Sequence, residues 1–192
     1  VCLMTSALAG PPFPELVHPV SGGKFDQRVT VLANGNLVAA DSVSGFLFLF
    51  NGATGQLIST ATFPGSSFTV SVIALKNGHF VCTNAGWNNG RGFVLWGNGV
   101  TGVSGPVSTA NSLMGSKAGD SVGQNVVALA NGGFVIISPA WDDVTAQDVG
   151  AVTYCDGNGA VTGMVSASNS LVGSKALDRV GSGGVVALSN SS

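Results

Sequence analysis

The sequence predicts an all-β fold, built as a partial β-propeller of four-stranded antiparallel blades with about three blades and the start of a fourth. The turn sequence Leu-x-Asn-Gly recurs along the chain, and 29 glycines interrupt any segment long enough for an ordinary helix. The leucines that open these turns are Leu32, Leu75, Leu129 and, before a degenerate Asn-Ser turn, Leu188. The intervals between these leucines are long enough for one supersecondary unit each, and such periods indicate a repeat architecture.

Each repeat is predicted to open with a β-hairpin. Asn-Gly between two apolar runs favours a type I′ turn, because both central residues of that turn take positive φ and these two residue types tolerate it best. The strands before the turns are short and apolar, at 29–32, 70–75 and 126–129. The strands after the turns are rich in β-branched and aromatic residues, at 37–40, 80–83 and 134–137. This composition is typical of buried strands.

Two further strands are predicted in each repeat. A third apolar run follows a polar loop, at 45–50, 92–96 and 150–154. After a second glycine-rich turn comes a weaker fourth strand, at 56–61, 103–108 and 161–166. Four strands make one propeller blade, so the sequence divides into a repeat domain at 25–192 with these blades: 25–66, 67–110, 120–168 and an incomplete 178–192.

The segment 1–24 is expected to lie outside the repeats. Residues 1–9 end in Ala-Leu-Ala, the small-residue pattern that signal peptidase recognises, and we interpret them as a signal-peptide remnant. An apolar first strand is the alternative. Residues 10–24 carry three prolines near their start, which excludes a helix and predicts an extended lead-in. The signal-peptide interpretation favours a secreted or cell-surface protein.

The composition limits the partners. Only 8% of the residues are charged and the formal net charge is −2, so the chain has no basic stripe of the kind that neutralises nucleic-acid phosphates. No apolar run approaches the roughly 18 residues that span a bilayer. We therefore expect no nucleic-acid partner and no membrane span. Phosphate-binding glycine motifs and metal-ligand clusters do not stand out either, so no cofactor is expected.

Two cysteines fall within the predicted blades. Cys82 occupies the position of a small buried hydrophobic residue in a second strand, and Cys155 lies at the end of a third strand. Two such scattered cysteines do not make a disulfide framework. A bridge between them across neighbouring blades stays open as an alternative.

The segments that join the repeats are copies of one element, since residues 111–123 match residues 169–181. Together with the Val-Val-Ala-Leu strand, the Asn-Gly turn and the Gly-Ala-Val-Thr-Tyr run at 150–154, their order resembles the FG-GAP repeat of the integrin α-subunit propeller. It is also similar to tandem repeats of large bacterial surface and secreted proteins. The resemblance covers about residues 25–192 and implies a β-propeller with an extracellular, adhesive role.

One departure from the FG-GAP pattern concerns calcium. Blades of that family often bind Ca²⁺ through an Asp-rich loop between their first two strands, because this cation takes six to eight oxygen ligands. Here that loop is a bare turn with Asn34, Asn77 or Asn131 and no carboxylate, so no metal site is predicted there. A cation would have to use Asp142, Asp143 and Asp148, for which a solvated polar loop is the commoner explanation.

Two tryptophans at equivalent positions suggest a ligand-binding face. Each follows a turn leucine at the same spacing and precedes a polar pair, which gives these candidate ligand-binding residues: Trp87, Asn88, Asn89, Trp141, Asp142 and Asp143. An exposed indole beside amide and carboxylate groups is suited to stacking on a sugar ring. The alternative is that each indole fills the gap between adjacent blades, as recurring aromatic residues in repeats usually do.

A lysine followed by an aspartate precedes the first strand of several repeats. The pairs are Lys24 with Asp26, Lys117 with Asp120, and Lys175 with Asp178. They are interpreted as turns capped by the aspartate through the backbone, with the lysine adding little. A repeated ligand clamp is the alternative.

The function predicted from these features is a non-catalytic extracellular repeat scaffold, acting as an adhesion or ligand-binding module. A glycan or a protein is the expected ligand. Because three repeats are fewer than the four to eight blades of a closed ring, further blades in cis or self-association are expected. The alternative is a carbohydrate-active propeller enzyme that uses Asp142, Asp143 or Asp148 as acid and base.

Overall fold

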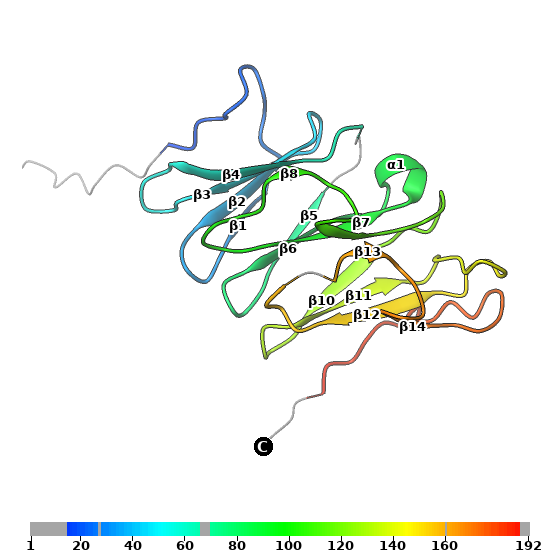
Figure 1. The fold of residues 1–192 in the computed structure, drawn as a ribbon. Coiled ribbons are helices and arrows are strands. Elements are labelled where there is room, and N and C mark those ends of the chain that lie inside the picture. The colour runs from blue at the N-terminus through cyan, green and yellow to red at the C-terminus, as the bar shows by residue number, and fades with distance from the viewer. Residues whose placement is uncertain (1–14, 27, 66–69, 160, 189–192) are drawn as a thin grey trace, which may run out of the picture.

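The computed structural model describes residues 15–26, 28–65, 70–159 and 161–188 (Figure 1). These residues form a mostly β fold of three sheets, which lie one above another in chain order. The only helix in the described ranges is the four-residue α1 (Trp87–Gly90), so the prediction of a β fold is confirmed at this level. No helix in the described part is long and apolar enough to cross a membrane.

The first sheet is five-stranded and mixed. Its first four strands form an antiparallel meander: β1 (Val29–Val31), β2 (Leu37–Asp41), β3 (Phe46–Phe50) and β4 (Leu57–Thr62). The fifth strand, β8 (Gly105–Pro106), comes from the following repeat and pairs parallel to β4.

The second sheet has the same plan, and the third lacks the parallel strand. The second sheet contains β5 (Ser71–Ala74), β6 (Phe80–Asn84), β7 (Phe93–Gly97) and β9 (Ser112–Met114), with β13 (Gly163–Met164) parallel to β9. The third sheet is antiparallel and contains β10 (Asn125–Ala128), β11 (Phe134–Ser138), β12 (Ala151–Cys155) and β14 (Leu171–Val172).

The predicted fourth strand is correct only in the first repeat. The segments 103–108 and 161–166 contribute β8 and β13 to the preceding sheet, whereas β9 and β14 complete their own sheets. Gly105 and Gly163 explain the difference, because their φ values of +82° and +97° interrupt an extended strand. The corresponding segment of the first repeat has no glycine or proline inside it and pairs with β3 as β4, with one register shift between Leu49 and Phe50.

The hairpin turns have a different geometry from the one predicted. In the first, the Gly35 N–H donates to the Leu32 carbonyl at 2.9 Å, and Leu32 N–H donates to the Asn36 carbonyl at 2.9 Å. Gly35 takes φ +84°, but Asn34 does not adopt positive φ. This is the three-residue loop in which a left-handed glycine follows a type I turn, so the type I′ prediction is wrong. The same bonds recur at Gly78 and Gly132.

The sheets pack face to face through apolar clusters. Between the first and second sheets lie Phe63, Phe80 and Phe93, all fully buried. A second cluster joins the second sheet to Phe134 and Ile136 of the third. Cys82 belongs to the first cluster and Cys155 to the second, and both are free thiols, so no bridge joins them.

The described part of the lead-in covers the outer face of the first sheet. Leu16, Val20 and Phe25 pack on Phe48 and Phe50 of β3 in a third apolar cluster. In Figure 1 this segment rises away from the sheet and returns over it. The expected signal-peptide remnant at 1–9 and the degenerate turn at 189–192 lie outside the described residues.

Candidate functional site

The loops between the second and third strands of each sheet gather at one end of the molecule, which we call the loop end. The hairpin turns and the second turns lie at the opposite end, which we call the turn end. At the loop end each third strand is preceded by a glycine with φ of +74° or +75°, at Gly45, Gly92 and Gly150. The loop end therefore holds the candidate ligand-binding residues.

A ladder of backbone hydrogen bonds ties the loop of the second sheet to the segment that follows it. Gly119 N–H donates to the Asn89 carbonyl at 3.2 Å, and Ser121 N–H donates to the Gly90 carbonyl at 2.7 Å. Next in the ladder, Val122 N–H donates to the Arg91 carbonyl at 3.1 Å. This ladder fixes the position of the loop without any side chain.

The third sheet repeats this ladder in the second copy of the joining segment. The donors are Leu177, Arg179 and Val180, and the acceptors are the carbonyls of Gln147, Asp148 and Val149, each pair at 3.0 Å. Each of these donors is the sequence equivalent of a donor in the first ladder. The two copies therefore have one structure as well as one sequence.

The glycine that precedes each third strand is required by close backbone contact. A Cβ atom added to Gly92 would lie 2.4 Å from the Val122 carbonyl oxygen, and one added to Gly150 would lie 2.3 Å from the Val180 nitrogen. Positive φ at both positions adds a second reason for glycine.

The aspartates of two Lys-Asp pairs cap turns, as the sequence predicts. Asp120 Oδ2 accepts from the backbone N–H of Ser116 at 2.7 Å and of Lys117 at 2.8 Å. Asp178 Oδ2 accepts from the equivalent N–H groups of Ser174 and Lys175. The hydrogen bond from Lys175 N–H, followed by that from Ser174, lowers the pKa of the Asp178 carboxyl.

Asp26, in the first Lys-Asp pair, has a different role. Its carboxylate accepts from Ser42 twice, from the backbone N–H at 3.0 Å and from the hydroxyl at 2.6 Å. Ser42 Oγ in turn accepts from the Val70 N–H at 3.1 Å. Asp26 therefore ties the end of β2 to the beginning of the second repeat.

Trp87 is half-buried at the interface of the first two sheets. Its ring meets Phe93 edge to face, with centroids 5.6 Å apart, and Nε1 donates to the Pro64 carbonyl at 3.2 Å. The adjacent Asn88 and Asn89 are exposed and left-handed, with φ of 50° and 60°. The three candidate residues of this loop thus form one partly accessible group.

Trp141 differs from Trp87 in exposure. It is 4% exposed and packs in the cluster between the second and third sheets, so it presents no free face for stacking. Its carbonyl accepts from Gly150 N–H at 3.0 Å, as the Trp87 carbonyl accepts from Gly92 N–H at 3.1 Å. The two tryptophans are therefore structurally equivalent, although the loop after Trp141 is longer.

The acidic loop of the third repeat is bound to its neighbours. Asp142 N–H donates to Asp120 Oδ1 at 3.2 Å, and Asp142 Oδ1 accepts from Asp148 N–H at 2.8 Å. Lys117 Nζ donates to the Asp143 carbonyl. The joining segment thus links the Asn88–Asn89 loop to the acidic loop in one continuous polar rim.

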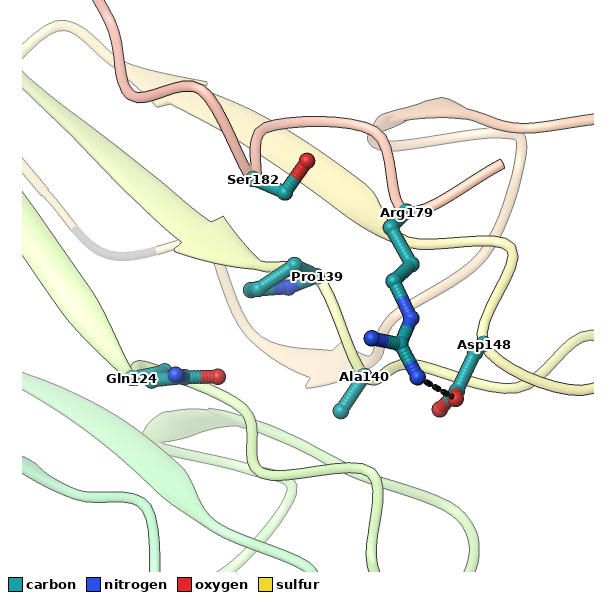
Figure 2. A pocket seen from close by; sticks show the side chains of 6 residues that line it. All are labelled: Gln124, Pro139, Ala140, Asp148, Arg179 and Ser182. Atoms are coloured by element: carbon teal, nitrogen blue, oxygen red, sulfur yellow. Dashed lines mark hydrogen bonds and ion pairs between the residues drawn. The ribbon is translucent and has the colours of Figure 1, made fainter. Parts of the chain in front are cut away.

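A hollow of about 370 Å³ lies beside Asp148. Figure 2 shows Arg179 turned toward Asp148, with Nη2 and Oδ2 2.7 Å apart, while Gln124, Pro139 and Ser182 line the other sides. In the described ranges no three His, Cys, Asp or Glu side chains are grouped so that they could hold a metal ion.

Hydrogen bonds at the turn end join successive repeats, which the sequence pattern does not predict. Asn34 Nδ2 donates to the Gly99 carbonyl at 2.8 Å, and Asn77 Nδ2 donates to the Gly157 carbonyl at 2.8 Å. Trp96 Nε1 donates to the same Gly157 carbonyl at 3.0 Å. The recurrence of Asn in every turn is the sequence signal for these bonds, but turn geometry alone also accounts for it.

Comparison with known proteins gives one family match. A repeat of unknown function (DUF5650) matches residues 74–124 and again residues 128–182, which together are more than half of the chain. No curated protein matches the chain. The two matched segments contain the two copies of the backbone ladder. The chain therefore belongs to the DUF5650 repeat family.

Proposed function

We propose that this protein is a non-catalytic extracellular scaffold that acts as an adhesion or ligand-binding module. The observation that carries the proposal is the backbone ladder, which recurs at equivalent residues of two successive repeats. It anchors the corresponding loops of successive sheets in the same way and leaves the tips of the loops exposed. A rigid framework that presents loops at one end is a common design for binding proteins.

We further propose that the three sheets are blades of a partial β-propeller of the FG-GAP kind. Two observations support this. The first strands lie in series, since β1 contacts β5 and β5 contacts β10, as strands around a central axis do. Successive sheets also pack face to face through separate apolar clusters, as adjacent blades do.

The proposed ligand surface is the polar rim at the loop end. It contains the exposed side chains of Asn88 and Asn89, the accessible part of Trp87, and the half-buried Asp142 and Asp143. Amide and carboxylate groups beside an aromatic edge suit the hydroxyls and apolar face of a glycan, or a polar protein loop. An extracellular location fits such ligands.

A carbohydrate-active enzyme is the second candidate, and the hollow beside Asp148 favours it. Asp142 and Asp148 are hydrogen-bonded neighbours, and a sugar-cleaving site needs two carboxyl groups. Against it, Asp148 is paired with Arg179, and both carboxylates lie within a structural loop. Release of reducing sugar from a polysaccharide panel, abolished in the variant Asp142→Asn with Asp148→Asn, would favour the enzyme.

Glycan and protein arrays probed with the full chain test the binding proposal. We expect a ligand whose binding is lost when Asn88 and Asn89 are both changed to glycine, because glycine keeps the left-handed backbone and removes only the amides. The matched control is Asn158→Gly, which removes an exposed amide at the turn end. Equal binding by all three proteins, or no binding to either array, would contradict the proposed surface.

A further inference from the structure

We infer that the outer face of the third sheet is one half of a repeat–repeat interface and binds a further four-stranded sheet of the same repeat family. This inference rests on the proposal that the three sheets pack as successive blades, and it does not depend on the identity of the proposed ligand. We call this surface the open face. It consists of Leu129, Val135, Val152, Tyr154 and Leu171.

Each residue of the open face has a counterpart on the second sheet. The counterparts are Leu75, Val81, Val94, Trp96 and Leu113, in the same order. All five pack in or against the cluster that the third sheet covers. The second sheet therefore shows what this set of side chains does when a following repeat is present.

Four of the five pairs differ in exposure, and Val135, at 7% exposed, is buried like its counterpart Val81. Leu113 is 0% exposed, whereas Leu171 is 69% exposed. Leu75 is buried beneath the following repeat and Leu129 is not, and Tyr154 is 56% exposed. A leucine and a tyrosine left open beside valines make an apolar surface of the kind that marks an interaction site.

The chain leaves the third sheet along the path it takes from the second. Gly123 lies against the side chain of Val94 in the second sheet, and Gly181 lies against the side chain of Val152 in the third. Residues 185–188 then repeat the Val-Val-Ala-Leu sequence of residues 126–129 that leads into the third hairpin. Val186 and Leu188 are each 84% exposed, so these apolar residues also have no covering surface in the described structure.

The existing interfaces define the chemistry of the missing partner. On its facing side the third sheet offers Phe134, Ile136 and Trp141, and at its turn end it offers the Gly157 carbonyl to Asn77. Asn131 is the equivalent donor on the open side. The partner must therefore present an apolar aromatic sheet face and, beside it, the carbonyl of a second-turn glycine.

A second copy of this chain does not offer that face. The surface that would correspond to it is the outer face of the first sheet, and this is covered by Leu16, Val20 and Phe25 of the lead-in. The lead-in thus covers the first sheet, whereas the open face is uncovered among the described residues, and each sheet of a stacked repeat protein packs on its neighbouring repeats. The occupant is therefore a further repeat.

Tyr154 reports directly on the open face, because it is the only tyrosine in the chain. The test compares the original protein with one in which a second copy of residues 130–188 follows Leu188. The inserted copy carries Tyr154→Phe, so that the original Tyr154 stays the only tyrosine in the extended protein. We expect tetranitromethane to nitrate Tyr154 in the original protein, and we expect this reactivity to be lost in the extended one.

The matched control carries Phe134→Asp and Ile136→Asp in the inserted copy only, and its Tyr154 should stay reactive. Amide exchange of the insert is measured in parallel. Unchanged nitration of Tyr154 in the extended protein overturns the inference. This holds whether or not the inserted residues gain protected amides, because the inference requires the open face itself to bind and order a following repeat. Protection of Tyr154 that grows with the concentration of the original protein overturns it in favour of a second copy. Array binding at the loop end is independent of either result.

Discussion

Asn77 Nδ2 donates a hydrogen bond of 2.8 Å to the carbonyl of Gly157, which lies far along the chain in the next sheet. The same side chain caps its own turn, because Asn77 Oδ1 accepts from the His79 N–H at 3.2 Å. Asn34 does both in the repeat before, toward Asn36 and Gly99. One asparagine therefore shapes its hairpin and holds the following repeat.

Asn77→Asp separates these two roles. The aspartate retains an oxygen for the His79 N–H but replaces the donor that faces the Gly157 carbonyl with a second oxygen. We expect the free energy of unfolding to fall by about 1–2 kcal/mol, the cost of leaving a partly buried acceptor facing another acceptor. Urea denaturation at pH 7 measures it.

Asn131→Asp is the matched control for this substitution. Asn131 caps its turn through the Gly133 N–H, and in the described structure no following repeat lies beside its amide. Its substitution should change the free energy of unfolding by less than about 0.5 kcal/mol. Equal effects at residues 77 and 131 would show that the bond to Gly157 contributes nothing.

Alanine substitution at Gly92 tests how closely the backbone packs at the loop end, and substitution at Gly78, in a hairpin turn, is its control. Both take positive φ, but a Cβ atom at Gly78 meets nothing within 4 Å, whereas one at Gly92 collides with the Val122 backbone. Gly78→Ala should therefore cost only the backbone strain, about 1 kcal/mol. Gly92→Ala should cost about 3 kcal/mol or more, because a backbone collision is added.

Thermal and urea unfolding of these two alanine variants give the comparison. The backbone ladder between residues 89–91 and 119–122 should also lose amide protection in Gly92→Ala and keep it in Gly78→Ala. Similar stability of the two variants would mean that the joining segment moves away from the third strand at little cost.

The strands were predictable from the sequence where pairing is local. The hairpins β5–β6 and β10–β11 occur at the predicted places because a short turn joins their strands. The pairing of β9 and β13 was not predictable, because three strands of the third sheet, β10, β11 and β12, separate them in the chain and they pair across a repeat boundary. Local composition carries no information on that choice.

The candidate site was predictable to a similar extent. The equivalence of Trp87 and Trp141 could be read from their spacing after the turn leucines, and the bonds to Gly92 and Gly150 confirm it. Their different exposure could not be read, because it depends on which side chains of the preceding sheet lie beneath each indole. The roles of Asn34 and Asn77 as donors between repeats needed the stacking of the sheets.

The Asp41 carboxyl makes the free energy of unfolding depend on pH in the acid range. It lies beneath the lead-in, with Oδ2 3.3 Å from His18 Nε2, and Oδ1 accepts from Ser44 N–H at 2.9 Å. Burial raises the pKa of this carboxyl, but the Ser44 hydrogen bonds, the charge of His18 and the Lys24 backbone together lower it below its usual value.

A carboxyl whose pKa is lower in the folded state stabilises the fold above its unfolded pKa, and this contribution is lost as the pH falls through the folded pKa. The free energy of unfolding should therefore decrease as the pH falls below about 4. Urea denaturation across the acid range should show a shallower decrease for Asp41→Asn. Parallel pH profiles for the two proteins would remove Asp41 as a source of acid sensitivity.

Cys82 and Cys155 should be unreactive in the folded protein. Burial raises the pKa of the Cys82 thiol, and the charge of Asp26 raises it further. Burial also raises the pKa of Cys155, to about 11, with a smaller opposing effect of the Val161 backbone. Since the thiolate is the reactive form, a Cys2→Ser variant at pH 8 should react with Ellman's reagent only as it unfolds. Immediate reaction of one thiol would place that cysteine at an accessible position.

Trp141 tests whether the buried indole acts by filling space or through its N–H group. In the described structure Nε1 is buried without a hydrogen-bond partner, although the ring packs between the second and third sheets. Trp141→Ala should lower the free energy of unfolding by about 3–5 kcal/mol, because it leaves a large cavity. Trp141→Phe should cost about 1 kcal/mol, since the loss of volume is offset by removal of an unsatisfied donor. If phenylalanine proves as costly as alanine, the indole N–H has a partner that stabilises the fold, and Trp141 then holds its loop by a polar bond as Trp87 does through Pro64.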